Sequence, residues 1–273
     1  MLDLSGKVAF VTGAGSVGDA PDATVWGNGK ATAVLLARQG AKVFGVDLRK
    51  EAVDVTKGII EKEGGTCVTR GVNMTIAGDV EAAVADCVEQ FGQIDILVNN
   101  VGGSAPGSAV TMSEEVWDTQ IDHNLKTAFL GCKYVIPIME KQGKGAIVNI
   151  ASIAGLSMSA DRAHIAYSTT KLGLFAFSKS IAITHAKQGI RCNTVVPGLM
   201  HTALVEHRLA KTIGANDLQG LIDKRNAQCP TGKMGNAWDI AHAVLFLVSD
   251  EASYISATEI VVDGGLTASR SSV

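Results

Sequence analysis

Short hydrophobic runs alternate with longer segments of helical periodicity along almost the whole chain. Seven of these runs are rich in Val and Ile and are bounded by Gly, Asn, Asp or Pro; they cover residues 7–13, 41–48, 66–72, 94–100, 145–152, 190–198 and 259–265. Near-continuous apolar runs of this length are typical of strands that are buried on both faces. We therefore predict that the runs form the strands of a parallel sheet.

Between these runs, apolar residues recur at helical spacing, and several segments end at glycine, as a helix does when it stops in a left-handed C-cap. The segments cover residues 29–40, 79–92, 114–143, 164–189 and 238–252. Alternating strands and helices with tight turns favour right-handed βαβ crossovers. The predicted fold is α/β, a single doubly wound parallel sheet with helices on both faces, and the predicted organisation is one domain over residues 1–273.

One long stretch, at about residues 199–235, has no clear strand pattern. We expect it to be a helical excursion over the C-terminal edge of the sheet. Because open α/β sheets bind ligands at that edge, the excursion is expected to cover a substrate.

Composition and charge narrow the class of protein. Hydrophobic residues make up 47% of the chain, enough for a buried sheet, and a formal charge of −3 gives no basic footprint for nucleic acid. The start has no secretory pattern, and no apolar run approaches the length of a membrane span. The five cysteines are scattered, which indicates free buried thiols, and the six histidines show no metal-ligand spacing. We expect a soluble cytoplasmic protein without a metal.

A glycine-rich turn follows the first predicted strand, which runs directly into Gly13, and a helical pattern begins at Gly29. This strand–turn–helix context favours dinucleotide binding. Asp47 ends the next predicted strand, where a carboxylate can accept both hydroxyls of an adenosine ribose and would repel a 2′-phosphate. The nearby Arg49 and Lys30 would soften that repulsion. The alternative is that Asp47 caps the following turn.

At these residues the chain resembles the short-chain dehydrogenase/reductase family, and the resemblance covers nearly its whole length. The family's turn reads T-G-x-x-x-G-x-G, and "TGAGS" joined directly to "GNGKATA" would supply it. The other motifs follow in order: "NNVG" at 99–102, Asn124, Ser152, "YSTTK" at 167–171, "PGLMHT" at 197–202, and "VVDGG" near the end. The resemblance implies a Rossmann-type fold and a nicotinamide-dependent oxidoreductase.

Residues 17–26 interrupt the family's turn as an insertion. Asp19 and Asp22 are expected to face solvent or to cap backbone groups, because carboxylates would repel a pyrophosphate. Trp26 is the large apolar residue that could pin the insertion by packing. Our hypothesis is a flap over the adenosine side of the cofactor that carries no catalytic residue; the alternative is a surface bulge unrelated to the cofactor.

Tyr167 and Lys171 are four residues apart in a helical pattern, so they share one face of the helix. A nearby ammonium stabilises a phenolate and lowers the pKa of a tyrosine toward neutrality. From the spacing alone, such a pair is an ordinary surface pair. The resemblance implies that Tyr167 is the general acid/base and that Lys171 is its electrostatic partner and a ribose anchor.

The resemblance assigns catalytic roles to two further residues. Ser152 follows a predicted strand, and its hydroxyl can stabilise the substrate oxygen or merely cap a turn. Asn124 lies within a predicted helix, where it either satisfies the backbone or holds a water that links to Lys171. Tyr167 follows Ser152 with two more intervening residues than is usual in the family, which puts the shape of the substrate pocket in doubt.

The resemblance also implies a set of cofactor contacts. They are Gly13, Ser16, Gly27, Asn28, Gly29, Asp47, Asn73, Met74, Asn100, Gly102, Tyr167, Lys171, Pro197, Met200 and Thr202. The candidate walls of the substrate pocket are largely apolar: Met158, Leu199, Leu204, Val205 and Leu209. His164, close to Tyr167, either touches substrate or is a plain helix-entry residue.

Together these features predict an NAD-dependent oxidoreductase that interconverts a secondary alcohol and a ketone. The alternatives are an NADPH-dependent 3-oxoacyl thioester reductase, against which Asp47 speaks, and a non-catalytic dinucleotide-sensing protein, which would not need the catalytic set. We expect a small-molecule partner, and the resemblance implies a homotetramer.

Overall fold

Seven parallel strands form one sheet in the order β3-β2-β1-β4-β5-β6-β9 in the computed structural model, which describes residues 2–17, 24–158, 163–207 and 218–269. The strands are β1 (Val8–Thr12), β2 (Lys42–Asp47), β3 (Cys67–Gly71), β4 (Ile96–Asn99), β5 (Gly145–Ile150), β6 (Ile190–Pro197) and β9 (Glu259–Val262). Each strand falls within one of the seven predicted runs. The predicted doubly wound parallel sheet is therefore confirmed.

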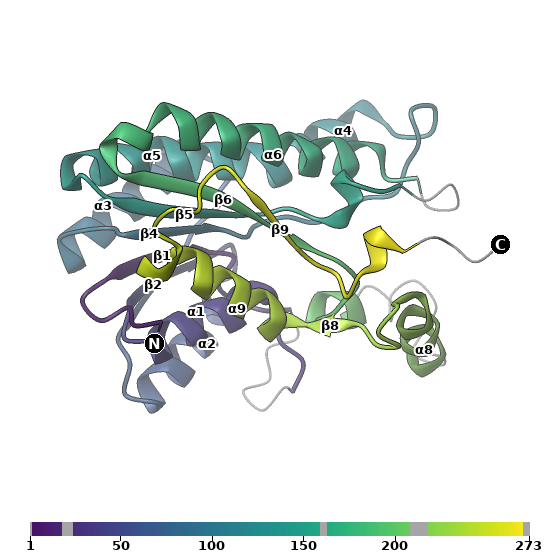
Figure 1. Cartoon of the computed structure of the whole chain (residues 1–273), viewed down its shortest axis with the longest axis horizontal. Coiled ribbons are helices and arrows are strands. Elements are labelled where there is room, and N and C mark those ends of the chain that lie inside the picture. Colours follow the sequence, from purple (N-terminus) through teal and green to yellow (C-terminus); the bar gives the residue numbers. More distant parts are fainter. Residues whose placement is uncertain (1, 18–23, 159–162, 208–217, 270–273) are drawn as a thin grey trace.

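Helices cover both faces of the sheet (Figure 1). On the lower face in the figure lie α1 (Asn28–Arg38), α2 (Lys50–Lys62) and α9 (Ala237–Val248). On the upper face lie α3 (Ala77–Phe91), α5 (Thr127–Gln142) and α6 (Ile165–Thr184). Each interface holds a continuous hydrophobic core, because the central strands β1, β2, β4, β5 and β6 are largely buried on both sides.

Two helical features differ from the sequence prediction. Helix α2 was not among the predicted segments. The predicted helix over residues 114–143 is α4 (Glu114–Ile121) and α5, separated by a π-helical turn at Asp122–Lys126. A π-helical turn inserts one residue into a helix and is frequent at functional sites. Asn124 is the buried residue of this turn.

The excursion at residues 199–235 contains the expected helix, α8 (Leu218–Gln228). Its two ends are joined by short strands, because β7 (Met200–His201) pairs with β8 (Gly235–Asn236). In Figure 1, α8 lies beyond the end of the sheet, on the side where the strands end. The pairing holds the start of the excursion against the C-terminal edge of the sheet.

The remaining sequence expectations concern thiols, membranes and metals. All five cysteines are free and buried, and burial raises the pKa of Cys67 and of Cys87 to about 12. In the part of the chain that the structure describes, no helix combines the length and apolar character needed to cross a bilayer. The same residues contain no cluster of three or more potential metal ligands from His, Cys, Asp and Glu.

Strand β1 lies between β2 and β4, so the winding of the chain reverses direction at β1. A crevice forms outside the carboxyl ends of strands at such a switch point, and ligands bind there. The residues that follow β1, β4, β5 and β6 at this edge include Gly13, Asn100, Ser152 and Gly198. The topology thus brings the predicted motifs to one place.

Candidate active site

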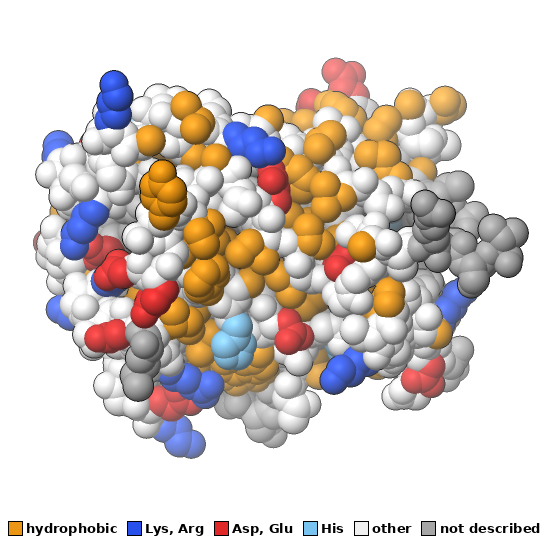
Figure 2. Space-filling view, viewed as in Figure 1, with side chains coloured by type: hydrophobic (Ala, Val, Ile, Leu, Met, Phe, Trp, Pro, Cys, Tyr) orange, Lys and Arg blue, Asp and Glu red, His pale blue; other side chains and the backbone are white. Residues whose placement is uncertain are grey.

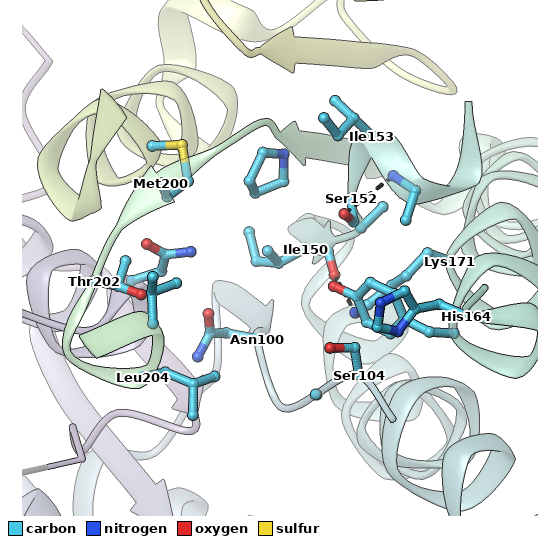
Figure 3. A pocket seen from close by; sticks show the side chains of 18 of the residues that line it. Asn100, Ser104, Ile150, Ser152, Ile153, His164, Lys171, Met200, Thr202 and Leu204 are labelled. Atoms are coloured by element: carbon cyan, nitrogen blue, oxygen red, sulfur yellow. Dashed lines mark hydrogen bonds between the residues drawn. The ribbon is translucent and has the colours of Figure 1, made fainter. Parts of the chain in front are cut away.

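A cavity of about 990 Å³ lies over the carboxyl ends of the strands. Its volume is at the upper end of the range for small-molecule sites, which gives room for an extended cofactor and a substrate together. Fourteen predicted site residues line it: Gly13, Ser16, Gly27, Asn28, Gly29, Asp47, Asn100, Gly102, Ser152, Tyr167, Lys171, Pro197, Met200 and Thr202. Figure 3 shows Ser152 and Lys171 on one side of the cavity, with Met200 and Thr202 on the other.

The glycine turn closes on itself despite the insertion. Gly13 has a φ of 63°, a conformation that suits glycine, and a Cβ on Gly29 would fall 1.9 Å from the carbonyl oxygen of Gly13. The two sides of the insertion are also tied together, because the Gly27 amide donates to the Ser16 hydroxyl at 3.1 Å. The Asn100 side-chain amide donates to the Gly13 carbonyl at 3.0 Å and fixes the turn to the end of β4.

The N-terminus of α1 opens on the cavity and suits an anion. Its first turn contains no acidic residue, and its N-cap, Gly27, makes no side-chain capping bond. The amide oxygen of Asn28 is buried and finds no hydrogen-bond donor among the described residues. Because backbone N–H groups and the helix dipole favour negative charge, this end of the helix fits the pyrophosphate of a dinucleotide.

Asp47 is held at the end of β2 by two backbone amides. One carboxylate oxygen accepts from Gly15 N at 3.1 Å, and the other accepts from Arg49 N at 3.1 Å. The capping alternative is thus realised, while the carboxylate also lines the cavity. The Arg49 guanidinium donates to the Ser16 carbonyl at 2.8 Å and lines the cavity as well. Lys30 is buried over the Trp26 ring and is not among the lining residues.

Asn73 and Met74, two predicted cofactor contacts, are not among the residues that line the cavity. The Asn73 side-chain oxygen accepts from the Thr75 amide at 3.0 Å and from its hydroxyl at 2.8 Å. Met74 is buried in the core between the sheet and the upper helices. Contact of these two residues with an adenine therefore stays a prediction.

Trp26, at the end of the insertion, packs as expected but against α9. Its ring centroid lies 5.0 Å from that of Trp238, and the Lys30 ammonium lies 4.8 Å from the centroid of the Trp26 ring. Among the described residues of the insertion and its borders, Ser16, Val17 and Gly27 line the cavity, and Trp26 does not. Asp19 and Asp22 lie outside the described residues, so their predicted orientation stays untested.

Lys171 and Tyr167 project from the first turns of α6. The Lys171 ammonium is buried and donates to the Ile150 carbonyl at 2.9 Å. It lies 5.8 Å from the centroid of the Tyr167 ring. Burial disfavours the charged form and lowers the pKa of Lys171 from 10.5 to about 8. The Lys171 ammonium thus lies beside the Tyr167 ring, and both residues line the cavity.

Asn124 is not among the residues that line the cavity. Its side-chain oxygen accepts from Gly103 N at 2.9 Å, and its amide donates to the Gly103 and Gln120 carbonyls, each at 3.0 Å. A Cβ on Gly102 would fall 2.7 Å from this oxygen and 3.0 Å from the Lys171 nitrogen. Asn124 and Lys171 thus flank Gly102, as a relay between them requires; the relay itself stays a prediction.

The structure shows the capping role of Ser152, and its role toward a substrate stays a prediction. Its hydroxyl accepts from Ala154 N at 3.2 Å and so caps the short 3₁₀ helix Ile153–Gly155. It also lines the cavity on the same side as Lys171 (Figure 3). The cap fixes the position of the hydroxyl, which retains its own proton for a ligand.

Four of the five predicted substrate-pocket residues line the cavity: Met158, Leu199, Leu204 and Val205. The fifth, Leu209, lies outside the described residues. Sequence reasoning did not place Ser104, Ser108 or Arg225 here, yet all three line the cavity. No motif marks them, because they come from loops and from α8, which only the tertiary fold brings to the site.

Comparisons with known proteins find relatives that match nearly the whole chain. A family model described as "Enoyl-(Acyl carrier protein) reductase" matches residues 23–267. The chain is 38% identical to 2-(R)-hydroxypropyl-CoM dehydrogenase of Xanthobacter autotrophicus, covering 96% of this chain and 99% of the relative. It is 35% identical to the 3-oxoacyl-[acyl-carrier-protein] reductase FabG of Thermotoga maritima, covering 97% and 99%.

A solved structure of a short-chain dehydrogenase/reductase from Burkholderia xenovorans superposes with a TM-score of 0.91 at 44% identity, covering 98% of both chains. Matches of this extent, together with the placement of Ser152, Tyr167 and Lys171 in one cavity, identify the family. The chain belongs to the short-chain dehydrogenase/reductase family, and it is an oxidoreductase that acts on CH–OH groups or the corresponding carbonyls.

Proposed function

We propose that the protein is an NAD-dependent oxidoreductase that interconverts a secondary alcohol and a ketone. The observation that carries the proposal is the approach of the Lys171 ammonium to the Tyr167 ring, 5.8 Å from its centroid, in a cavity that also contains the Ser152 hydroxyl. A phenol beside a buried cation is suited to proton transfer. The glycine turn and the N-terminus of α1 supply a dinucleotide-binding end to the same cavity.

A nicotinamide cofactor, when bound along the glycine turn, supplies the hydride chemistry. The proton is transferred by a side chain of the protein itself. In the oxidation direction, the Tyr167 phenolate takes the proton of the substrate hydroxyl; in the reduction direction, the phenol returns it. Lys171 stabilises the phenolate, because an ammonium nearby favours the negatively charged form. Gly13, Asn28 and Gly29 would hold the pyrophosphate, and Tyr167 and Lys171 would border the nicotinamide ribose.

Ser152 would orient the substrate oxygen. Because its hydroxyl accepts from Ala154 N, its proton is directed away from that amide and is available to the substrate. A preorganised donor of this kind stabilises the negative charge that develops on the oxygen as hydride is transferred. Asn124, which binds the backbone at Gly103, would hold the loop that carries Gly102 against Lys171.

The preference for NAD rests on Asp47. Its carboxylate lines the cavity at the end of β2, where a 2′-phosphate would meet a negative charge. Lys30, which was expected to soften this repulsion, is buried over Trp26 instead. Arg49 lines the cavity and favours the second candidate function, an NADPH-dependent reductase of 3-oxoacyl thioesters. FabG of Thermotoga maritima, a relative at 35% identity, is a 3-oxoacyl-[acyl-carrier-protein] reductase.

A direct assay separates the two candidates. Reduction of NAD and of NADP would be followed by absorbance with a panel of secondary alcohols, and oxidation of both reduced cofactors with ketones and a 3-oxoacyl thioester. We expect turnover of secondary alcohols with a higher kcat/KM for NAD than for NADP. A kcat/KM for NADP equal to or above that for NAD, with the thioester as best substrate, would establish the second candidate instead.

We also propose a cytoplasmic homotetramer. Five unpaired, buried thiols support a reducing compartment. Apolar side chains remain exposed on the long helices and the edge strand: Phe129 on α5, Leu172 and Ile183 on α6, and Val261 on β9. Figure 2 shows hydrophobic side chains spread over the face that carries β9, between α6 and α9. Light scattering at micromolar concentration tests this, and a monomer mass would refute it.

A further inference from the structure

His164 is a cavity-lining residue that the proposed mechanism does not use. It is the N-cap residue of α6, three positions before Tyr167, and its side chain makes no capping bond. Its ring nitrogen Nδ1 lies 3.1 Å from the carbonyl oxygen of Ala105. In Figure 3, His164 lies on the same side of the cavity as Ser152, Ser104 and Lys171.

The His164 ring is held by the loop that precedes α4. On either side of His164, Gly107 N donates to the Ala163 carbonyl at 2.9 Å, and Ile165 N donates to the Gly107 carbonyl at 3.1 Å. Gly107 and His164 form a β-bridge. With the Nδ1 contact to Ala105, the backbone and the ring of His164 are both fixed by one short segment.

This segment is tied in turn to a predicted catalytic residue. Ala105 N donates to the Gln120 side-chain oxygen at 3.1 Å, and the Asn124 amide approaches the same oxygen at 3.3 Å. Gln120 and Asn124 are both buried. A hydrogen-bonded path therefore leads from Asn124 through Gln120 and Ala105 to His164. Such a path preorganises a side chain for a ligand.

The contact with Ala105 determines whether the free nitrogen of the His164 ring donates or accepts a hydrogen bond. A carbonyl oxygen only accepts, so Nδ1 must carry the proton, and in the neutral ring Nε2 is then an acceptor. Among the described residues, no partner binds Nε2. Ser104 and Ser108 also line the cavity, but a hydroxyl can donate or accept, whereas Nε2 of a neutral imidazole only accepts. It therefore distinguishes a ligand hydroxyl from a ligand carbonyl.

We infer that His164 binds a second hydroxyl group of the substrate, so that the preferred substrates are diols or hydroxyketones with a hydroxyl next to the reacting carbon. The inference rests on the proposed function, since it adds a substrate class to the same site. The reacting oxygen would lie at Tyr167 and Ser152, and the second hydroxyl would donate to Nε2. A second carbonyl in that place would set an acceptor against an acceptor.

The test compares matched substrates in pairs: cyclohexanol with trans-cyclohexane-1,2-diol, and butan-2-ol with butane-2,3-diol. The measured quantity is the ratio of kcat/KM for the diol to that for the mono-alcohol. We expect the wild-type ratio to favour the diol. In His164→Phe the ratio should fall about tenfold, because the loss of one hydrogen bond of about 1.4 kcal/mol corresponds to that factor. His164→Asn, which keeps an acceptor oxygen, should retain part of the preference.

His242→Phe is the matched control. His242 also has its Nδ1 near a backbone carbonyl, 2.7 Å from that of Trp238, but it lies on α9 and does not line the cavity. Its variant should keep the wild-type ratio, and thermal melting would show whether each variant is folded. A folded His164→Phe with an unchanged ratio overturns the inference and leaves the proposed function standing. A wild type that oxidises neither member of either pair overturns the inference, and inactivity toward every alcohol and ketone overturns the proposed function as well.

Discussion

The side-chain oxygen of Asn124 occupies the space that a side chain on Gly102 would need: a Cβ there would lie 2.7 Å from that oxygen and 3.0 Å from the Lys171 nitrogen. The resemblance to the short-chain dehydrogenase/reductase family implied that this glycine contacts the cofactor. The contacts show that residue 102 is also restricted by the protein itself, because Asn124 and Lys171 converge on it.

Gly102→Ala should therefore impair catalysis. The methyl group must displace either Asn124 or Lys171, and a shift of about 1 Å in a catalytic group can cost about 10²-fold in rate. We expect kcat/KM to fall at least tenfold while the chain stays folded. Gly58→Ala in α2 is the control, because a Cβ there meets nothing within 4 Å. Steady-state kinetics and melting of both variants check this, and full activity of Gly102→Ala would contradict it.

Tyr167→Phe tests the proton transfer. The substitution keeps the ring and removes the oxygen that carries the proton. General acid–base catalysis contributes about 10²- to 10⁴-fold, so kcat should fall by that factor. The Kd for NADH, measured by fluorescence, should stay near the wild-type value. Tyr254→Phe is the control, since Tyr254 is fully exposed. Retention of most of the activity by Tyr167→Phe would rule out this mechanism.

The sequence predicted the sheet well because each strand falls in a short run between breakers, and the central strands are largely buried on both faces. It predicted the helices less well where local signals conflict. Helix α2 contains Val53, Val55 and Ile59 together with Gly58, residues that favour strands or weaken helices, so its helical pattern was not recognised. Its amphipathic packing against the sheet decides its conformation.

The residues of the candidate site, too, were predicted only where the sequence carries a clear signal. Motif residues such as Ser152, Tyr167 and Lys171 were predicted because the family's pattern marks them. The π-helical turn around Asn124 was not, because the residues on both sides continue an ordinary helical pattern. Ser104 and Arg225 were missed for another reason: they reach the cavity from loops and from α8, whose position depends on contacts far apart in the sequence.

Lys171→Met should stabilise the protein at neutral pH while abolishing most activity. Burial lowers the pKa of Lys171 from 10.5 to about 8. Between these values the unfolded chain binds a proton that the folded chain does not, so the stability of the wild type rises with pH through this window. Below it, the folded state bears the full cost of a buried ammonium, at most roughly 3.5 kcal/mol at about 1.4 kcal/mol per pKa unit.

Because the Ile150 carbonyl loses its donor in Lys171→Met, we expect a net gain of about 1–2 kcal/mol at pH 7. The gain should disappear by about pH 10 and become a small loss, because the wild-type lysine is then neutral when folded and still donates to the Ile150 carbonyl. Urea unfolding of both proteins without cofactor, at the two pH values, measures this. A gain that does not change with pH would show that the charge of Lys171 is not the cause.

Asp47→Asn should weaken the preference for NAD over NADP. The amide keeps the shape and one acceptor oxygen, but it removes the negative charge that would face a 2′-phosphate. We expect the ratio of kcat/KM for NADP to that for NAD to rise about tenfold or more, which corresponds to about 1.4 kcal/mol. Asp79→Asn, in the exposed first turn of α3, is a control that removes the same charge elsewhere. An unchanged ratio in Asp47→Asn would remove the basis for preferring NAD.

The packing of Trp26 shows which part of the protein the border of the insertion supports. The hypothesis of a flap held over the adenosine by Trp26 requires that Trp26 support the cofactor side of the cavity. Instead, its ring packs on Trp238 of α9, and it does not line the cavity. We therefore expect Trp26→Ala to lower the free energy of unfolding and to leave the Kd for NADH unchanged. A double-mutant cycle with Trp238→Ala should give a coupling of about 0.5–1.5 kcal/mol, as for other aromatic pairs. A stable Trp26→Ala with a raised Kd for NADH would instead restore the flap, because the tryptophan would then act on the cofactor and not on the fold.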